Sequence, residues 1–209
     1  PSEIIVQNAG QACATVQLVY RTASACQTPV TDTITSLAPG EAARLSPPTG
    51  LETVLSSLQL SSTQPLAVLV DEVRNDFMKW TFRAWPGNEA QAVNEGSLVY
   101  KDYNGWQSSI QVQNLEASAM VVQAEVFDMS GNKTATITVG PICAQGVWDC
   151  DLQQVPAVPS GFAGRLRITS TWDTGKILSV VKLADYSFGG SGMAFAYNTT
   201  LIPPGGLPT

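Results

Sequence analysis

The 209-residue sequence contains no histidine and few charged residues. Without histidine it lacks the usual base of a Ser–His or Cys–His pair and the usual nitrogen ligand of zinc. Its 11 Lys and Arg residues are scattered and outnumbered by 17 Asp and Glu residues, so a nucleic-acid surface is not expected. The net charge of −6 disfavours docking on an anionic membrane. No apolar run approaches the roughly 18 residues of a membrane span, so no membrane insertion is expected.

The sequence also lacks a recognisable catalytic or cofactor-binding motif. The adjacent carboxylates Asp71 and Glu72 would point to opposite faces of a strand, so they would not converge on one substrate. We therefore expect a protein that is not an enzyme and that binds no cofactor and no metal.

Strand-forming and turn-forming residues are abundant instead. Hydrophobic residues make up 44% of the chain and charged residues 13%. Val, Thr, Ser, Gln, Gly and Pro recur throughout, which is typical of short strands and tight turns. No long segment has helical periodicity. Residues 41–55 are the best candidate for a helical turn, although Pro47 and Pro48 interrupt them.

A repeat organises the chain. Residues 4–8 (IIVQN) match residues 110–114 (IQVQN), and the match continues through an alternating strand and a turn. Further along, a Pro-Gly turn at residues 39–40 matches a Gly-Pro turn at residues 140–141. Near the end of each copy, residues 90–94 (AQAVN) match residues 194–198 (AFAYN).

Each copy holds about seven short strands, which predicts an all-β fold of two tandem antiparallel β-sandwich domains of immunoglobulin-like size. We expect the first sandwich in residues 1–96, the second in residues 97–198, and a C-terminal tail in residues 199–209. In the second copy, a strand at residues 97–102 precedes a turn at Asn104-Gly105 and a second strand.

The phrase Tyr103-Asn-Gly-Trp106, the strand at residues 110–114 and the turn at residues 128–132 (DMSGN) resemble the tandem immunoglobulin-like β-sandwich repeats of bacterial surface and secreted proteins. The resemblance covers both copies and is clearest in the second. It implies an extracellular structural or interaction role and supplies no catalytic residues. The first copy departs from it by lacking the Tyr-Asn-Gly-Trp phrase and the strand before it.

The two ends of the chain complement each other. The first copy has no counterpart of residues 97–102, whereas residues 198–203 (NTTLIP) align with residues 94–100 (NEGSLVY) with one gap. An unpaired sheet edge attracts strands, and donation of the tail to another copy would join subunits head-to-tail. The expected partners are thus other copies of the chain, in a homopolymer. The subunit-contact candidates are Ile4, Ile5, Val6, Thr200, Leu201, Ile202 and Pro203. The alternative is a two-domain monomer or an excerpt of a longer surface repeat protein.

Four cysteines leave the disulfide pairing open. Cys143 and Cys150 flank a short loop and could close it, and Cys13 and Cys26 are the default remaining pair. The objection to the second pair is that an extended strand between them spans roughly 25 Å. Cys26 therefore either folds back or pairs elsewhere, including between subunits.

The segment at residues 75–87 concentrates aromatic residues. We expect it to pack in a core or domain interface, with a subunit contact or stacking on surface glycans as alternatives. Its aromatic residues are Phe77, Trp80, Phe82 and Trp85.

Several features fit export. The chain has four Cys and many Ser and Thr residues, and sequons for glycosylation occur at Asn132 and Asn198. It begins at Pro1 and carries no signal peptide, so we expect a mature or trimmed form. The expected function is a structural subunit of an extracellular filament or cell-surface assembly, with a secreted adhesion or glycan-binding module as the alternative.

Overall fold

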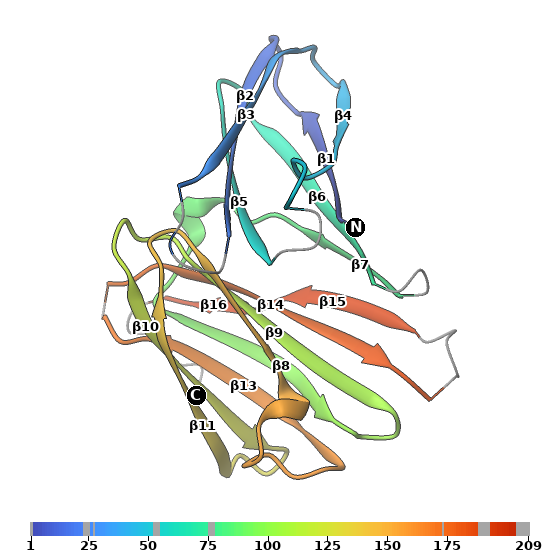
Figure 1. Cartoon of the computed structure of the whole chain (residues 1–209), viewed down its shortest axis with the longest axis vertical. Coiled ribbons are helices and arrows are strands. Elements are labelled where there is room, and N and C mark those ends of the chain that lie inside the picture. Colours follow the sequence, from blue (N-terminus) through green and yellow to red (C-terminus); the bar gives the residue numbers. More distant parts are fainter. Residues whose placement is uncertain are drawn as a thin grey trace.

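A computed structural model describes residues 2–22, 26, 28–51, 55–74, 78–172, 174–187 and 193–203 of the chain, and for Arg74 it describes the backbone alone. Phe77 and residues 204–209 lie outside this range. The fold is all-β and its sheets are antiparallel, as the sequence predicts (Figure 1). None of the described helices is long and apolar enough to cross a membrane.

The first half of the chain forms two sheets, in the orders β4-β1-β6-β7 and β3-β2-β5. Their strands are β1 (Ser2–Asn8), β2 (Ala14–Thr22), β3 (Val30–Leu37), β4 (Ala42–Leu45), β5 (Ser56–Ser62), β6 (Leu66–Arg74) and β7 (Met78–Arg83). A short 3₁₀ helix, η1 (Gly87–Glu89), leads into the second half.

The second half forms two more sheets, in the orders β12-β9-β14-β15 and β11-β10-β13-β8-β16. Its elements are β8 (Val93–Lys101), β9 (Trp106–Asn114), β10 (Met120–Asp128), β11 (Lys133–Ile142), β12 (Val147–Asp151), η2 (Leu152–Gln154), β13 (Phe162–Ser170), β14 (Ile177–Asp185), β15 (Ala194–Asn198) and β16 (Thr200–Ile202). The predicted boundary between residues 96 and 97 falls inside the continuous strand β8.

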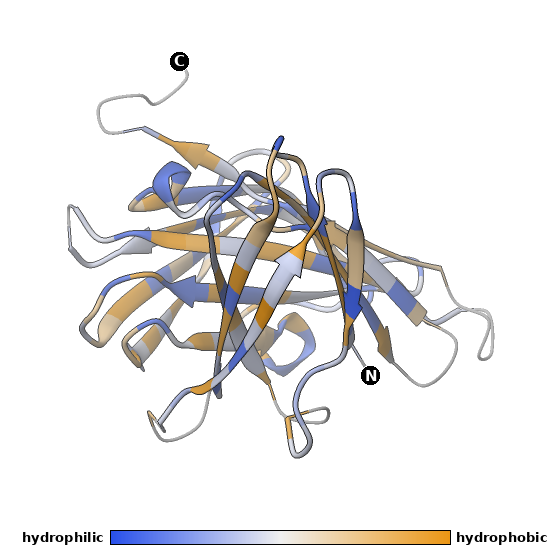
Figure 2. Ribbon diagram, turned by 90° about the horizontal axis from the view of Figure 1, so that it is seen from above, coloured by the Kyte–Doolittle hydropathy of each residue, from blue (hydrophilic) through white to orange (hydrophobic). Residues whose placement is uncertain are grey.

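Apolar and polar residues alternate along many strands (Figure 2), which places one face of each sheet in a core. The second half has an extensive core around Ile110, Val122 and Val181. The first half has a smaller separate core around Ile4, Val6 and Leu18. The sheet orders show that strands β1 to β7 correspond in turn to β9 to β15.

Asn8 and Asn114 mark this correspondence most closely. Both are fully buried at the end of their strand. Each side-chain amide donates hydrogen bonds to the carbonyl four residues later and to a carbonyl at the end of the third strand, Leu37 or Ile142. Each amide oxygen accepts from the N–H two residues later. The Gln-Asn sequence therefore repeats because its asparagine plays the same role in both halves. It ties the end of its strand to the following loop and to the end of the third strand by hydrogen bonds.

Three local predictions are wrong. Residues 42–45 form strand β4 rather than a helical turn, and Gly140-Pro141 lies within β11 rather than in a turn. The match between residues 90–94 and 194–198 does not hold in space either. Residues 194–198 form β15, whose counterpart is β7, whereas residues 90–94 lead into β8. The Asn104-Gly105 turn is confirmed: both residues have positive φ, and Tyr103 and Trp106 close the hairpin.

Candidate functional site

The two halves differ at one sheet position. In the second half, β13 pairs with β10 on one side and with β8 on the other. In the first half, β5 is the counterpart of β13 and pairs with β2. Among the described strands, none pairs with the other edge of β5. Within the described part of the chain, the first half therefore has a strand-wide vacancy beside β5, at the place that β8 fills in the second half.

The vacancy leaves the core of the first half open. Leu58 and Leu60 on β5 face inward, since they pair across from the buried Tyr20 and Leu18, yet both are only partly buried. Their counterparts Leu166 and Ile168 on β13 are 1% and 0% exposed. The inward-facing residues of β6 are partly buried too, namely Leu66, Val68 and Val70.

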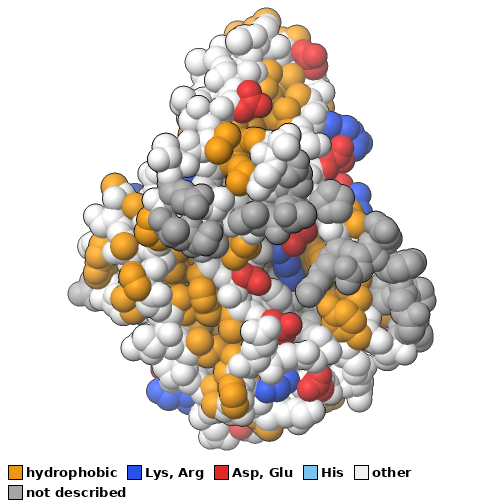
Figure 3. Space-filling view, in the orientation of Figure 1, with side chains coloured by type: hydrophobic (Ala, Val, Ile, Leu, Met, Phe, Trp, Pro, Cys, Tyr) orange, Lys and Arg blue, Asp and Glu red, His pale blue; other side chains and the backbone are white. Residues whose placement is uncertain are grey.

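These side chains line a groove of about 1190 Å³ between the halves. One wall is the open interior of the first half, and the other is the outer face of β9 and β14, including Gln111, Leu178 and Lys182. Figure 3 shows hydrophobic side chains gathered on the visible face of the first half. The groove is apolar where it enters the first sandwich and polar along the second half.

In the second half, β8 is held tightly in the equivalent position. The Tyr197 hydroxyl accepts a hydrogen bond from the Leu98 N–H at 3.0 Å and donates one to the Leu98 carbonyl. Burial raises the pKa of Tyr197 to about 12. A Cβ on Gly96 would lie 3.2 Å from Val181 Cγ2 and 3.4 Å from Leu166 Cβ, so this strand passes close to both sheets.

Direct contacts hold the halves together along the groove. Trp80 is 4% exposed and packs on Ala184, and its indole N–H donates to the Leu183 carbonyl at 3.0 Å. Lys182, which is 5% exposed, pairs with Glu72. These contacts place the first half firmly over the outer face of the second.

A disulfide also joins the halves. Cys26 bonds Cys143, with 5.3 Å between their Cα atoms, and beside it the Ser57 hydroxyl donates to the Gln145 carbonyl at 2.8 Å. Cys13 is exposed and Cys150 partly buried, and both are free thiols. Burial beside Asp149 and Asp151 raises the pKa of Cys150 to about 11.

Both expected pairings of these cysteines are therefore wrong. Cys143 is hydrogen-bonded to Asn114 at one end of β9, whereas Cys150 pairs across from Ile110, four residues or about 13 Å along that strand. Cys13 and Cys26 lie beyond opposite ends of β2. The extended strand between them keeps the two cysteines too far apart for a disulfide, as its length predicts.

The tail is extended but pairs within its own subunit. Residues Thr200, Leu201 and Ile202 form β16, opposite Glu95, Asn94 and Val93 at the start of β8. Ile202 is 8% exposed, while Thr200 and Pro203 are exposed. Just before β16, the hydroxyl of Thr199 is buried and hydrogen-bonded to Ser179 and Asn94. In this state Leu201 and Ile202 do not occupy the place of Leu98 and Val99.

Ile4 and Val6 lie in the interior of the first half. They are 3% and 0% exposed and lie in β1, at the centre of its sheet between β4 and β6. Ile5, on the opposite face of β1, is partly buried. The vacancy inferred from comparing the two copies lies beside β5 and not beside β1.

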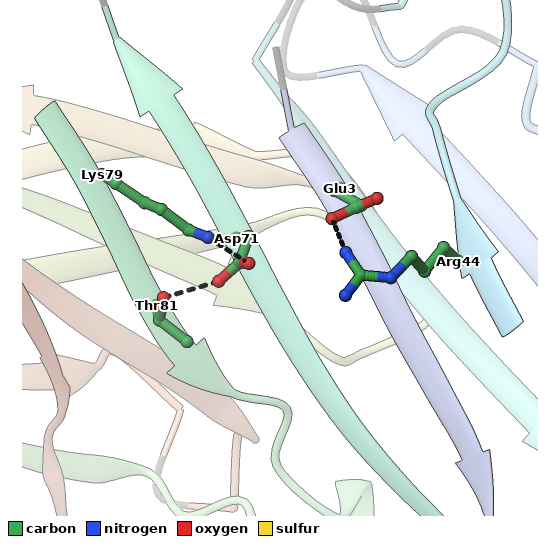
Figure 4. Close-up of polar contacts among 5 residues, drawn as sticks. All are labelled: Glu3, Arg44, Asp71, Lys79 and Thr81. Atoms are coloured by element: carbon green, nitrogen blue, oxygen red, sulfur yellow. Dashed lines mark hydrogen bonds and ion pairs between the residues drawn. The ribbon is translucent and has the colours of Figure 1, made fainter. Parts of the chain in front are cut away.

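The outer face of the sheet formed by β4, β1, β6 and β7 carries ion pairs, as Figure 4 shows. Glu3 and Arg44 are 2.7 Å apart, as are Asp71 and Lys79. Hydrogen bonds from Lys79 and Thr81 lower the pKa of Asp71 below its ordinary value. This charged face is unlike the apolar side chains with which the first half lines the groove.

The predicted aromatic cluster separates into distinct environments. Trp80 lies in the contact between the halves, and Phe77 is outside the described residues. Phe82 is partly buried, lines the groove and has Lys182 Nζ 5.9 Å from its ring centre. Trp85 lies under the Arg83 guanidinium at 4.3 Å. Because Trp80 is buried, these rings do not form one exposed platform for a sugar.

The two sequon asparagines both use their side-chain amides. Asn132 donates to Asp128 at 3.0 Å, within the predicted turn at residues 128–132. Asn198 donates to the Arg83 carbonyl at 3.0 Å, next to the contact between the halves. Among the described residues, no group of three or more Cys, Asp or Glu side chains is placed to hold a metal ion.

Comparison with known proteins adds no family. No family model matches the chain, and no curated protein matches it. Among solved structures, one titled "Crystal Structure of Thermotoga maritima 1070" aligns with 56% of this chain and 98% of its own. The TM-score is 0.47 and the identity 8%, and we base no argument on this similarity.

Proposed function

We propose that the chain is a structural subunit of an extracellular assembly, and that copies join head-to-tail when the groove of one accepts a strand from another. The observation that carries this proposal is the vacancy beside β5, where inward-facing leucines stay partly exposed although their counterparts in the second half are sealed.

The chemistry of the groove favours a strand as its occupant. The free edge of β5 offers backbone N–H and C=O groups, which an added strand can pair, and the groove offers apolar side chains for the inward residues of that strand. Sealing each partly exposed leucine is worth on the order of 1 kcal/mol. The second half supplies an internal example of the filled arrangement in β8 and β13.

The C-terminal segment of a second copy is the donor that fits best. Residues 200–202 are extended and apolar at two of three positions, and they align with the part of β8 that fills the equivalent place. Their pairing with β8 is only three residues long, and the cost of exposing Ile202 on release is recovered when Ile202 is buried again in the groove. Thr199 stays anchored by its buried hydrogen bonds and gives the segment a fixed starting point.

Such a contact joins unlike surfaces of identical subunits. The acceptor site lies in the first half and the donor segment follows β15 at the end of the second half, so a joined pair of subunits still has one free acceptor and one free donor. Repetition yields a filament, or a ring if the geometry closes. The disulfide between Cys26 and Cys143 supports assembly in an oxidising compartment, as expected outside the cytoplasm.

Truncation tests the proposal. Purified chain should form concentration-dependent assemblies in sedimentation velocity and electron microscopy, and removal of residues 200–209 should leave folded monomers. Leu58→Asp in the groove should have the same effect, whereas Leu69→Asp should not. Leu69 is the matched control because it is 44% exposed on the outer face of β6. Unchanged assembly after truncation would contradict the proposal.

A further inference from the structure

The strand that fills the equivalent place in the second half is irregular. Leu166 of β13 lies opposite Gly96 of β8, but two residues earlier on β13 Gly164 lies opposite Val99. Strand β8 therefore carries one extra residue between Gly96 and Val99, which is a β-bulge. A bulge leaves backbone groups that the neighbouring strand does not pair.

The hydroxyl of Tyr197 forms hydrogen bonds with backbone groups of β8 at the bulge. It takes both the N–H and the carbonyl of Leu98, which lies inside the bulge. Further along β8, the N–H of Tyr100 donates to the Ser108 hydroxyl at 2.7 Å. The bulged strand thus depends on hydroxyl groups supplied by β15 and β9.

The first half lacks the first of these hydroxyls. Val181 pairs with Tyr197, and its counterpart Val70 pairs with Phe82, so Phe82 stands where Tyr197 stands. A phenylalanine ring cannot accept the N–H of a bulged residue. A bulged strand beside β5 would leave a partly buried backbone N–H and carbonyl without the hydroxyl that pairs them in the second half, which is costly.

The tail has one residue fewer than the matching segment of β8, and the missing residue falls at the bulge. In the alignment of residues 198–203 with residues 94–100, the gap falls beside Gly96, at the bulge of β8. Without that residue the tail is a regular strand that needs no tyrosine. Pro203 then takes the place of Tyr100, whose N–H donates to the Ser108 hydroxyl of β9, so proline lacks an N–H that is directed at β9 in the second half.

We infer that the donated tail pairs with β5 as a regular antiparallel strand, with Ile202 of one copy opposite Ser56 of the next and Thr200 opposite Leu58. This register rests on the proposed function and assigns its contact residues. Ile202 takes the place of the fully buried Val99. Thr200 takes the place of Gly96, where its Cβ meets Val70 and Leu58, the counterparts of Val181 and Leu166, but no tyrosine hydroxyl, because Phe82 replaces Tyr197.

Cysteine cross-linking tests the register. In a background with Cys13→Ser and Cys150→Ser, one cysteine replaces Thr200 or Ile202 and a second replaces Ser56 or Leu58, giving four variants. Directly opposite residues have Cα atoms within the 4.4–6.8 Å range that a disulfide needs, whereas residues two places out of register do not. Each variant is first checked for assembly by sedimentation velocity and is then oxidised.

The expected result is a ladder of covalent oligomers on a denaturing gel for Ile202→Cys with Ser56→Cys and for Thr200→Cys with Leu58→Cys. The two crossed combinations should give none. The two matched pairs guard against one variant failing to fold. Assembly with ladders only from the crossed combinations overturns the register but leaves strand donation standing. Monomers throughout, with no ladder, overturn the proposed function and the register with it.

Discussion

Leu58 and Leu166 occupy equivalent places in the two halves, but only Leu166 is sealed by a neighbouring strand. Leu58 pairs with Tyr20 on one side, as Leu166 pairs with Val126. On its other side Leu166 lies opposite Gly96, whereas Leu58 borders the groove. One sequence thus contains both the filled and the unfilled form of the same sheet position.

This difference predicts unequal costs of truncating the two side chains. In the monomer lacking residues 200–209, Leu166→Ala should lower the free energy of unfolding by about 2–5 kcal/mol, as for fully buried leucines. Leu58→Ala should lower it by only about 1 kcal/mol, because the side chain is already partly in water. Urea denaturation measures both. Equal losses would mean that Leu58 is sealed within the monomer.

The hydroxyl of Tyr197 should stabilise β8 against β13. Tyr197→Phe removes both hydrogen bonds to Leu98 and leaves two partly buried backbone groups without this partner, so we expect a loss of about 1–3 kcal/mol in urea denaturation. Faster hydrogen exchange should be confined to β8 and its neighbours. The matched variant Phe82→Tyr should give the monomer no added stability, since its groove holds no strand. A gain in the stability of Phe82→Tyr would mean that a strand already occupies the groove beside β5 in the monomer.

Removing the disulfide should destabilise the chain strongly. Cys26 and Cys143 are 117 residues apart, and closing a loop of that length stabilises the folded state by about 4–5 kcal/mol in the chain-entropy account. Cys26→Ser with Cys143→Ser should therefore lower the thermal midpoint markedly. Cys13→Ser with Cys150→Ser is the control and should be nearly neutral. If the control were as damaging, the pairing described above would be incorrect.

Asp71 should contribute to acid sensitivity. Its folded-state pKa lies below its ordinary value of 3.8 because Lys79 and Thr81 donate hydrogen bonds to the charged form. The stability it adds is fully present above that value and is lost as the pH falls through the lowered pKa. Asp71→Asn should thus be less stable than the parent at pH 7, and the difference should shrink under acid. A difference that stays constant with pH would contradict this role.

Strand periodicity and turn chemistry predicted most of the fold. Alternation along β2 and β10, the Asn104-Gly105 turn and the repeated Gln-Asn phrase are local signals, and each matches a feature of the structure. The failures come from signals that are short or not local. Two alanines and an asparagine were enough to align residues 90–94 with 194–198, although sheet pairing places these segments in different roles.

The candidate site was only partly accessible to sequence reasoning. Comparison of the two copies showed that the first has one strand fewer, because the strands can be counted from the sequence pattern. The same comparison could not place the vacancy beside β5, since sheet order depends on pairing between distant strands. The bond between Cys26 and Cys143 was equally inaccessible, because it depends on how the first half lies over the second.

Complementation between two inactive variants tests the central claim most directly. The chain lacking residues 200–209 keeps an intact groove, whereas Leu58→Asp keeps an intact tail, and each alone should be monomeric. Sedimentation velocity of an equimolar mixture should show a one-to-one dimer and nothing larger, because only one donor and one acceptor remain compatible. A mixture that contains only monomers, although the unmodified chain assembles, would contradict strand donation.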